Sequence, residues 1–540
     1  MDLIFHNGRI VTMDEEQEAA QAVAIKNDKI TSIGSNEQIL ALKEAGSEII
    51  DLKGRALLPG FNDSHMHLME YAQNRTKVDL RHCKSVEEII ETTRNFINKR
   101  NINKGEWVYG WGWDHGLFQE KRMPNRQDLD RASSDHRIAI TRTCCHIMAV
   151  NTLTLQKIGI EQKPAAVEGG NVDTDEQGTP TGILEEKAMK LVNDLKPPLD
   201  EEALKDLIKQ AAGDFLSAGL TSVQTDDLAF LGSDLMPVLT GAYQELESAG
   251  GLNLRVNLQC LLPSVEELQA ALDRGYRTGQ GGPYFKIGPL KLLTDGSLGG
   301  RTALLSEPYD DSSPYQGVEV LSVKTLEALV NLASERKMQV ATHAIGDLAV
   351  ERVLNAYEKA ARRYPQADPR YRIIHASMAT NELLERFKKL DIIADIQPPF
   401  IPSDYIIVDW HLDEKRASWT YRWKDFVKQG IKLSGGSDCP VDDYPPLEGV
   451  HAAVTRQDKK GNPPGGWHPD QCLSLKEALY IYTMGSAYSS FEENVKGSIT
   501  AGKFADLVVL SDDITSLEPD EIKNLQVDLT VVGGKIFYSR

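Results

Sequence analysis

Short apolar runs separated by turn residues dominate both ends of the chain. At the N-terminal end, runs at 3–5 and 9–12 flank Asn7-Gly8, and runs at 23–25 and 30–33 flank Asn27-Asp28. These are patterns of β-hairpins. At the C-terminal end, the predicted strands are 507–510, and 529–532 with 535–538 around Gly533-Gly534. We therefore predict one small β domain assembled from both termini, residues 1–57 and 490–540, although two separate terminal subdomains would give the same pattern.

Strands alternate with helices in the middle of the chain. Helical patterns include 201–216 and 323–335. The predicted strands are 222–225, 255–261, 291–294, 339–343, 372–375, 392–396 and 431–435. Repeated alternation indicates a parallel sheet, and the commonest closed form of such a sheet is the (β/α)8 barrel. We predict an α/β fold in which residues 58–80 and 210–489 form a TIM barrel.

Residues 81–209 do not follow this alternation. Ser85-x-x-Glu88 has the spacing of a capping box, and it precedes a helical pattern that carries Ile89 and Ile90. We predict that this segment is an inserted α+β subdomain that covers the active site.

Composition narrows the class of protein. The 540 residues include 79 acidic and 60 basic side chains, a net charge of −19, which argues against binding to nucleic acid or to an anionic membrane. No apolar run reaches the roughly 18 residues that span a bilayer, and the first residues lack the pattern of a secretion signal. The six cysteines form no CxxC pair, so we expect a reduced, cytoplasmic protein without a thiolate zinc site.

The segment PGFNDSHMH carries the first candidate chemistry. Residues two apart in a strand point the same way, so His65 and His67 can present two imidazoles to one ion. An HxH motif alone is weak evidence, because most such histidines are packed or exposed without a ligand.

Three further ligand types lie at the ends of predicted strands. His343 and His375 end their strands, and Asp438 follows the strand that ends at Gly435. Each could be an ordinary polar cap. In a barrel, however, the carboxyl ends of the strands converge on the face where active sites form. Together with the HxH pair they predict a metal site.

Lys291 lies in the apolar segment GPLKLLTDG. Such a lysine usually extends its amine to solvent or pairs with an acid. The functional alternative is a desolvated amine that reacts with carbon dioxide. The resulting carbamate could bridge two cations, which an ammonium group cannot do.

Several motifs resemble one known family. PGFNDSHMH, LKLLTDGSLGGRTA, VATHAIGD, IIHASM and SGGSDCPV are similar to segments of the amidohydrolase superfamily, in particular the YtcJ-like amidohydrolase-3 family. ITAGKFADLVVLSDD resembles the tail of many amidohydrolases, and RTCCHIMAVN and GILEEKA resemble the inserted region of this family. The likeness covers essentially the whole chain, and the motifs keep the order of the family. It implies that the terminal β segments form the composite β-sandwich domain of this superfamily.

The resemblance implies a role for each candidate ligand. It places His65 and His67 on the first barrel strand around the more buried metal. It makes Lys291 a carboxylated bridging ligand, and His343 and His375 ligands of a second metal. Asp438 would bind metal and act as the general base.

The implied activity is hydrolysis of a non-peptide C–N bond, in an amide, formamide or cyclic amide, by metal-activated water. The cofactor would be a divalent metal, Zn²⁺ by preference. Two ions are expected, with one as the alternative. The implied partner is a small-molecule substrate, and a homodimer is a generic expectation.

Substrate contacts are harder to read from the sequence. The candidates lie in the insert and near the strand ends, and each could equally serve packing or a surface ion pair. They are Trp113, Asp114, Arg142, His146, Asp295, Arg301 and Gln397.

Two other functions remain open. A single-metal deaminase would share HxH, but typically carries a glutamate near the strand-five histidine and lacks the strand-four lysine. Here Ala-Ile-Gly-Asp347 follows His343, and Lys291 is present. A non-catalytic binding or regulatory protein is the third possibility, because fold does not fix function.

Overall fold

The computed structural model describes the chain except residues 145, 163–166, 196–198 and 310–313. The chain has two compact units, which are Met1–Glu70 with Glu201–Arg540, and Tyr71–Asp200. The second unit lies mostly within the segment predicted as an insert, and α2 (Leu68–Arg75) spans the boundary.

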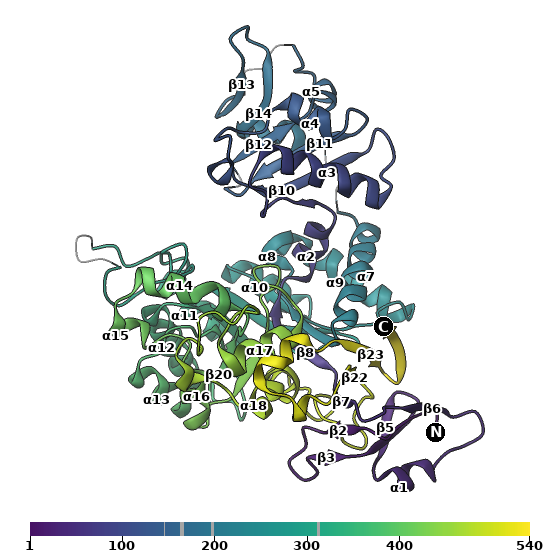
Figure 1. Cartoon of the computed structure of the whole chain (residues 1–540). Helices are drawn as coiled ribbons and strands as arrows, with labels where there is room; N and C mark the ends of the chain where they lie inside the picture. Colours follow the sequence, from purple (N-terminus) through teal and green to yellow (C-terminus); the bar gives the residue numbers. More distant parts are fainter. Residues whose placement is uncertain (145, 163–166, 196–198, 310–313) are drawn as a thin grey trace. The chain divides into compact units, whose positions relative to one another are not determined.

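The first unit contains a nearly closed parallel sheet of eight strands, in the order β21-β20-β19-β18-β17-β16-β15-β8 (Figure 1). The strands are β8 (Phe61–Met66), β15 (Leu220–Thr225), β16 (Arg255–Leu261), β17 (Phe285–Leu293), β18 (Val340–Ala344), β19 (Arg372–His375), β20 (Ile393–Ile396) and β21 (Leu433–Gly435). Nearly all their residues are buried, as expected of a parallel sheet covered on both faces. The predicted TIM barrel is confirmed.

Loop hydrogen bonds join the first and last strands of the barrel. The backbone N–H of Asp438 donates to the carbonyl of His65 at 2.8 Å, and the N–H of His67 donates to the carbonyl of Cys439 at 2.7 Å. The barrel is therefore held closed at the carboxyl ends of β8 and β21.

Amphipathic helices connect the strands. For example, α12 buries Val350, Val353, Leu354 and Tyr357, which recur at helical spacing on one face. The longer helices of this unit are α7 (Glu201–Ser217), α9 (Met236–Ser248), α10 (Val265–Asp273), α11 (Val323–Glu335), α12 (Asp347–Arg363), α13 (Asn381–Lys389), α14 (Phe400–His411) and α17 (Pro446–Thr455). The shorter ones are α1 (Asn36–Leu40), α8 (Leu228–Leu231), α15 (Glu414–Ala417), α16 (Trp423–Lys428), α18 (Leu475–Tyr480) and α19 (Ser486–Ser489).

The predicted start of the fourth barrel strand is wrong. The predicted strand is 291–294, and the segment before it contains Gly288 and Pro289, two residue types that usually interrupt strands. In the structure β17 runs through both residues, and an irregularity in its pairing with β16 accommodates them between Leu258 and Cys260. Lys291 consequently lies near the carboxyl end of its strand.

The barrel interior contains a buried ion pair. The guanidinium of Arg372 on β19 contacts the carboxylate of Asp395 on β20, and both side chains are fully buried. Arg372 also donates to Gln224 Oε1 at 2.6 Å and to the carbonyl of Ser64 at 2.8 Å. This network links four strands directly below the histidines.

Strands from both ends of the chain form two further sheets. One has the order β5-β4-β1-β6, and the other has the order β24-β23-β22-β7-β2-β3, so that N-terminal and C-terminal strands lie side by side (Figure 1). The strands are β1 (Leu3–His6), β2 (Arg9–Val11), β3 (Ala19–Ala20), β4 (Ala22–Lys26), β5 (Lys29–Gly34), β6 (Glu48–Asp51), β7 (Ala56–Pro59), β22 (Leu507–Leu510), β23 (Val527–Val532) and β24 (Lys535–Ser539). Residues of both sheets, including Phe5, Ile10 and Val509, share one buried cluster.

Two of the three predicted hairpins are confirmed, and one is wrong. β4 pairs with β5, and β23 pairs with β24. The strands around Asn7-Gly8 do not pair with each other, because β1 lies in one sheet and β2 in the other. The turn at Asn7, which has a φ of 57°, carries the chain between sheets.

The second unit is an α+β unit of its own. Its sheet has the order β13-β14-β12-β11-β10-β9. The elements are β9 (Val78–Asp79), β10 (Trp107–Trp113), β11 (Arg137–Arg142), β12 (Ile147–Val150), β13 (Gly170–Thr174), β14 (Pro180–Glu186), α3 (Val86–Arg100), α4 (Arg126–Ala132), α5 (Thr152–Lys157) and α6 (Lys190–Asn193). Ser85 caps α3 as predicted, but the reciprocal half of the capping box is absent at this described site. The carboxylate of Glu88 accepts from the N–H of Lys84 instead.

Within the described residues, no helix combines the length and apolar character that crossing a membrane requires.

Candidate metal centre

The six predicted ligands lie at or just beyond the carboxyl ends of barrel strands. His65 and His67 lie at the end of β8, and His375 ends β19. His343 is the penultimate residue of β18, Lys291 lies near the end of β17, and Asp438 follows β21. The parallel order of the sheet places all six at one end of the barrel.

Three of these residues form a compact group of potential ligand atoms. One carboxylate oxygen of Asp438, Oδ1, lies 3.0 Å from Nε2 of His67 and 3.2 Å from Nε2 of His65. The ligand atoms of the three residues all lie within 4.8 Å of one another. Two imidazoles and a carboxylate at this spacing are a donor set for a divalent cation.

Lys291 lies beside this group and is almost completely buried, with 1% of its surface exposed. Its Nζ is 3.4 Å from Nε2 of His65 and 3.6 Å from Oδ2 of Asp226. That Oδ2 is buried and has no hydrogen-bond partner in the described structure. An amine in this position faces ligand atoms and not solvent, which distinguishes it from an ordinary surface lysine.

His343 and His375 extend the cluster on its other side. Their ring centroids are 4.4 Å apart, and the ring of His375 is 5.7 Å from that of His65. Nε2 of His343 lies 3.2 Å from the carbonyl of Gly296 and 3.4 Å from Oδ1 of Asp295. The structure thus brings all six predicted residues into one continuous group.

Hydrogen bonds to Nδ1 hold three of the imidazoles. Gln259 Oε1 accepts from His65 at 2.9 Å, and Gln397 Oε1 accepts from His375 at 2.8 Å. The carbonyl of Asp226 accepts from His67 at 2.9 Å. With Nδ1 engaged as a donor, Nε2 of each ring is left as the ligand atom.

Asp226 and Gln259 were not predicted from the sequence. Both are completely buried, on or just after barrel strands. The sequence feature that could have identified such residues is a polar side chain in an otherwise apolar strand, as in Asn257-Leu258-Gln259. Strand alternation alone did not show which of these polar residues faces the metal centre.

Burial and mutual charge shift the titration of the cluster. Burial lowers the pKa of His65 to about 3, with a further contribution from the Lys291 charge. Burial also opposes protonation of His67, but hydrogen bonding to the Asp438 carboxylate outweighs it and raises the pKa of His67 to about 9. Burial alone would raise the pKa of Asp438, but the neighbouring imidazoles of His65 and His67 outweigh it and hold this pKa well below the usual range. The carboxylate is therefore ionised at neutral pH.

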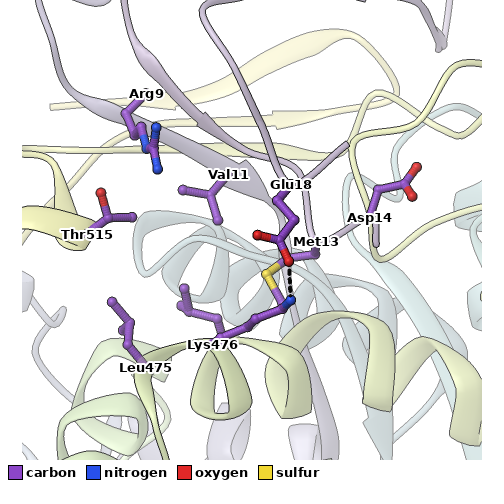
Figure 2. A pocket seen from close by; sticks show the side chains of 9 residues that line it. Arg9, Val11, Met13, Asp14, Glu18, Leu475, Lys476 and Thr515 are labelled. Carbon is purple, nitrogen blue, oxygen red and sulfur yellow. Dashed lines mark hydrogen bonds and ion pairs between the residues drawn. The ribbon is translucent and has the colours of Figure 1, made fainter. Parts of the chain in front are cut away.

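A cavity of about 620 Å³ opens onto the cluster. His343, His375 and Asp438 form part of its wall. A second hollow, of about 150 Å³, lies between the β-sandwich and α18, where Lys476 pairs with Glu18 at 2.6 Å (Figure 2). It contains none of the predicted ligands, so we assign the functional site to the larger cavity.

The predicted substrate contacts of the first unit have other partners. Asp295 lines the cavity, but its carboxylate accepts from the backbone N–H groups of Leu304, Ile345 and Gly346 at 2.8–3.1 Å. Gln397 is bonded to His375, and the guanidinium of Arg301 lies 5.3 Å from the ring centroid of Tyr309. Asp295 and Gln397 therefore shape the site and orient a ligand residue.

The predicted substrate contacts of the insert also have partners within their own unit. Trp113 is completely buried in the core, and its indole N–H donates to the carbonyl of Ile140 at 3.1 Å. Arg142 pairs with Asp114 at 2.6 Å, and His146 lies 3.2 Å from Glu186. Trp113 thus serves packing, and the other three form polar contacts at the surface of the insert.

Comparison with known proteins identifies the family. The model of the Amidohydrolase family matches residues 48–538. YtcJ of Bacillus subtilis, named as an amidohydrolase, is 36% identical over 546 residues, which cover 100% of both chains. The N-substituted formamide deformylase of Arthrobacter pascens is 27% identical over 556 residues, 100% of this chain and 98% of its own.

A solved structure agrees with this assignment. An uncharacterized metal-dependent hydrolase from Pyrococcus horikoshii OT3 superposes with a TM-score of 0.75 and 32% identity, covering 96% of this chain and 99% of its own. The family match and the full-length likeness to YtcJ show that the chain belongs to the amidohydrolase family, within its YtcJ-like amidohydrolase-3 group.

Proposed function

We propose that the protein is a metal-dependent hydrolase that cleaves an amide-type C–N bond of a small, non-peptide substrate. The observation that carries the proposal is the convergence of His65 and His67 on one oxygen of Asp438, with the buried Nζ of Lys291 beside them. The named relatives support a hydrolase, and the deformylase from Arthrobacter pascens makes N-substituted formamides the first substrates to test.

The donor set fits a binuclear centre. His65 and His67 would hold one divalent cation, and His343 and His375 the second. Lys291, after its amine adds to carbon dioxide, would supply a carbamate between them. Zn²⁺ suits imidazole and carboxylate ligands of this kind. When bound, such cations lower the pKa of water and polarise a carbonyl group.

Asp438 has the position and charge of a general base. Its carboxylate is ionised, and it lies in the wall of the cavity that would hold the substrate. It would take a proton from the water that attacks the carbonyl carbon. It would then return this proton to the nitrogen of the leaving amine, so that amide and water become carboxylic acid and amine.

The remaining residues position these groups. Gln259 and Gln397 fix the orientation of His65 and His375 through Nδ1, and Asp295 holds the loop that follows β17 against the start of α12. These contacts preorganise the site before the substrate arrives, which is how a protein environment lowers the barrier of such a reaction.

The test is metal analysis coupled to a substrate screen. The full-length protein is purified with zinc or manganese, and metal content is measured beside the hydrolysis of N-formyl, N-acyl and cyclic amides. We expect two metal equivalents and release of amine. One equivalent with ammonia release from aminated heterocycles would instead identify a deaminase. A metal-replete protein that is inert on both panels would indicate a non-catalytic role.

A further inference from the structure

The cavity above the metal centre has a strongly apolar wall. Its volume of about 620 Å³ falls within the range of cavities that enclose small molecules, about 300–1,000 Å³. The apolar side chains come from the ends of β17 and β18, from α14 and from the loop after β21. They are Leu293, Leu298, Ile345, Phe400, Ile407 and Val441. An extended hydrocarbon portion of a substrate therefore fits this space.

The charged groups of the same wall have one sign. Within the described residues that line the cavity, the ionisable groups are histidines and aspartates, and lysine and arginine are absent. Asp438 belongs to the metal centre, and Asp295 is occupied by three backbone N–H groups. Two carboxylates remain, Asp404 on α14 and Asp442 on the loop after β21.

Among the described residues, Asp404 and Asp442 have hydroxyl partners but no cationic partner. Tyr421 donates its hydroxyl to Asp404, and Ser403 donates to Asp442 Oδ2 at 3.0 Å. Neither carboxylate forms an ion pair with a described residue of the chain. Burial, followed by the nearby carboxylates of Asp404, Asp443 and Asp438, raises the pKa of Asp442 to about 7. A positive charge placed here would relieve this repulsion.

We infer that the site is selective for cationic amides, in which an apolar chain separates the scissile bond from an ammonium group that binds Asp404 and Asp442. The inference rests on the proposed function, because it assigns the substrate class of the same cavity. It follows from a cavity lined by apolar side chains and by two carboxylates that form no ion pair with a described residue. The same lining disfavours a substrate with a carboxylate at the far end of its chain, because the described lining residues include no lysine or arginine to pair with it.

The experiment uses three formamides that share a pentyl chain. The far end of the chain is an ammonium group, a methyl group or a carboxylate. Affinity for the zinc-loaded, full-length protein is measured by calorimetry, and kcat/KM is measured wherever turnover occurs. We expect the ammonium compound to be preferred about tenfold over the methyl compound, as for one charge-assisted contact, and the carboxylate compound to be the poorest.

Single-residue variants test which carboxylates cause the preference for the ammonium compound. Asp442→Asn and Asp404→Asn should each reduce the preference for the ammonium compound over the methyl compound to a few-fold. Asp409→Asn removes an exposed carboxylate from the same helix, outside the cavity, and should leave the preference unchanged. Melting temperatures check that each variant is folded.

The two hypotheses fail in different ways. If neither these formamides nor the wider amide panel is hydrolysed, the proposed function fails, but tighter binding of the ammonium compound that depends on Asp442 still supports the cation site. If hydrolysis occurs and the carboxylate or methyl compound is preferred, the cation site is wrong and the hydrolase stands. A preference for the ammonium compound that survives both cavity variants also overturns the assignment to these aspartates.

Discussion

The Nζ of Lys291 lies 3.4 Å from Nε2 of His65, with both side chains buried. The charge of Lys291 adds to burial in lowering the pKa of His65, so Nε2 of this ring keeps its lone pair for a ligand contact. In the proposed binuclear centre, Lys291 is the residue on which the metal count depends.

Replacement of Lys291 should change the metal stoichiometry. Lys291→Ala removes the proposed bridging group and is expected to lose one metal equivalent per chain, with bicarbonate and a short carboxylic acid restoring part of it. Lys286→Ala, on the same strand but paired with Glu492, is the control and should keep both equivalents. Unchanged stoichiometry in Lys291→Ala, by elemental analysis, would refute the carbamate.

Replacement of Asp438 should separate metal binding from catalysis. Asp438→Asn keeps the size of the side chain but cannot take a proton from water. We expect kcat to fall by about 10²–10⁴-fold, while metal content is largely retained. Steady-state kinetics and metal analysis on the same sample measure both. A rate close to that of the unaltered enzyme would exclude Asp438 as the base.

Gln397 provides a test of the sequence interpretation. As a partner of His375 Nδ1, it should affect the metal: Gln397→Leu is expected to weaken metal affinity about 10–100-fold in chelator competition. As a substrate contact, which was the prediction from sequence, it should instead raise KM at full metal loading. The two measurements distinguish these roles, and Gln259→Leu should behave like Gln397→Leu.

Metal uptake should depend on pH through His67. Its pKa is raised to about 9, so in the metal-free protein below that pH the imidazole is protonated and a cation must displace the proton. Affinity for zinc should rise about tenfold per pH unit from pH 7 until it levels near pH 9. A flat profile over this interval, in competition titrations, would contradict a protonated His67.

The same shift affects stability in the opposite direction. Because the folded pKa of His67 lies above its ordinary value of 6.5, its pairing with Asp438 stabilises the metal-free protein fully below about pH 6.5. This contribution is lost as pH rises through about 9. The melting temperature of the metal-free protein should fall across that window, while the zinc-loaded protein should show a smaller change.

Breaking the buried pair of Arg372 and Asp395 should cost more stability than breaking an ion pair at the surface. Asp395→Asn leaves the Arg372 charge without its counter-ion and is expected to cost about 3–5 kcal/mol. Glu327→Gln removes a partner of Lys359 at the surface and should cost at most about 1 kcal/mol. Denaturant unfolding of the two variants compares them. Equal losses would show that the interior pair is not a main source of stability.

The ligand set could be predicted because each residue type lies at a recognisable place in the pattern. His343 and His375 lie within the last two residues of apolar strands, and barrel geometry gives such positions one common face. Lys291 lies in a predicted strand, but a lysine in an apolar strand does not by itself indicate a bridging carbamate, and that role came from the family resemblance. Its predicted carboxylation therefore remains a prediction from that resemblance.

The parts that could not be predicted depend on contacts between distant segments. Asn7-Gly8 has the local signature of a hairpin, but the shared core of the two sheets separates Phe5 from Ile10 into different sheets. Asp404 and Asp442 likewise carry no local motif. They reach the same cavity only because α14 and the loop after β21 fold over the barrel end.

The hydrogen bonds between His65 and Asp438 and between His67 and Cys439 join the first barrel strand to the last. The backbone groups that close the barrel and the side chains that would bind an ion therefore belong to the same few residues. An ion bound there would link the first and last strands of the barrel through residues that are 371 positions apart in the sequence. Assembly of the barrel and binding of the metal ion would then be completed together. A nascent chain could therefore not bind the ion until the last barrel strand had been synthesised.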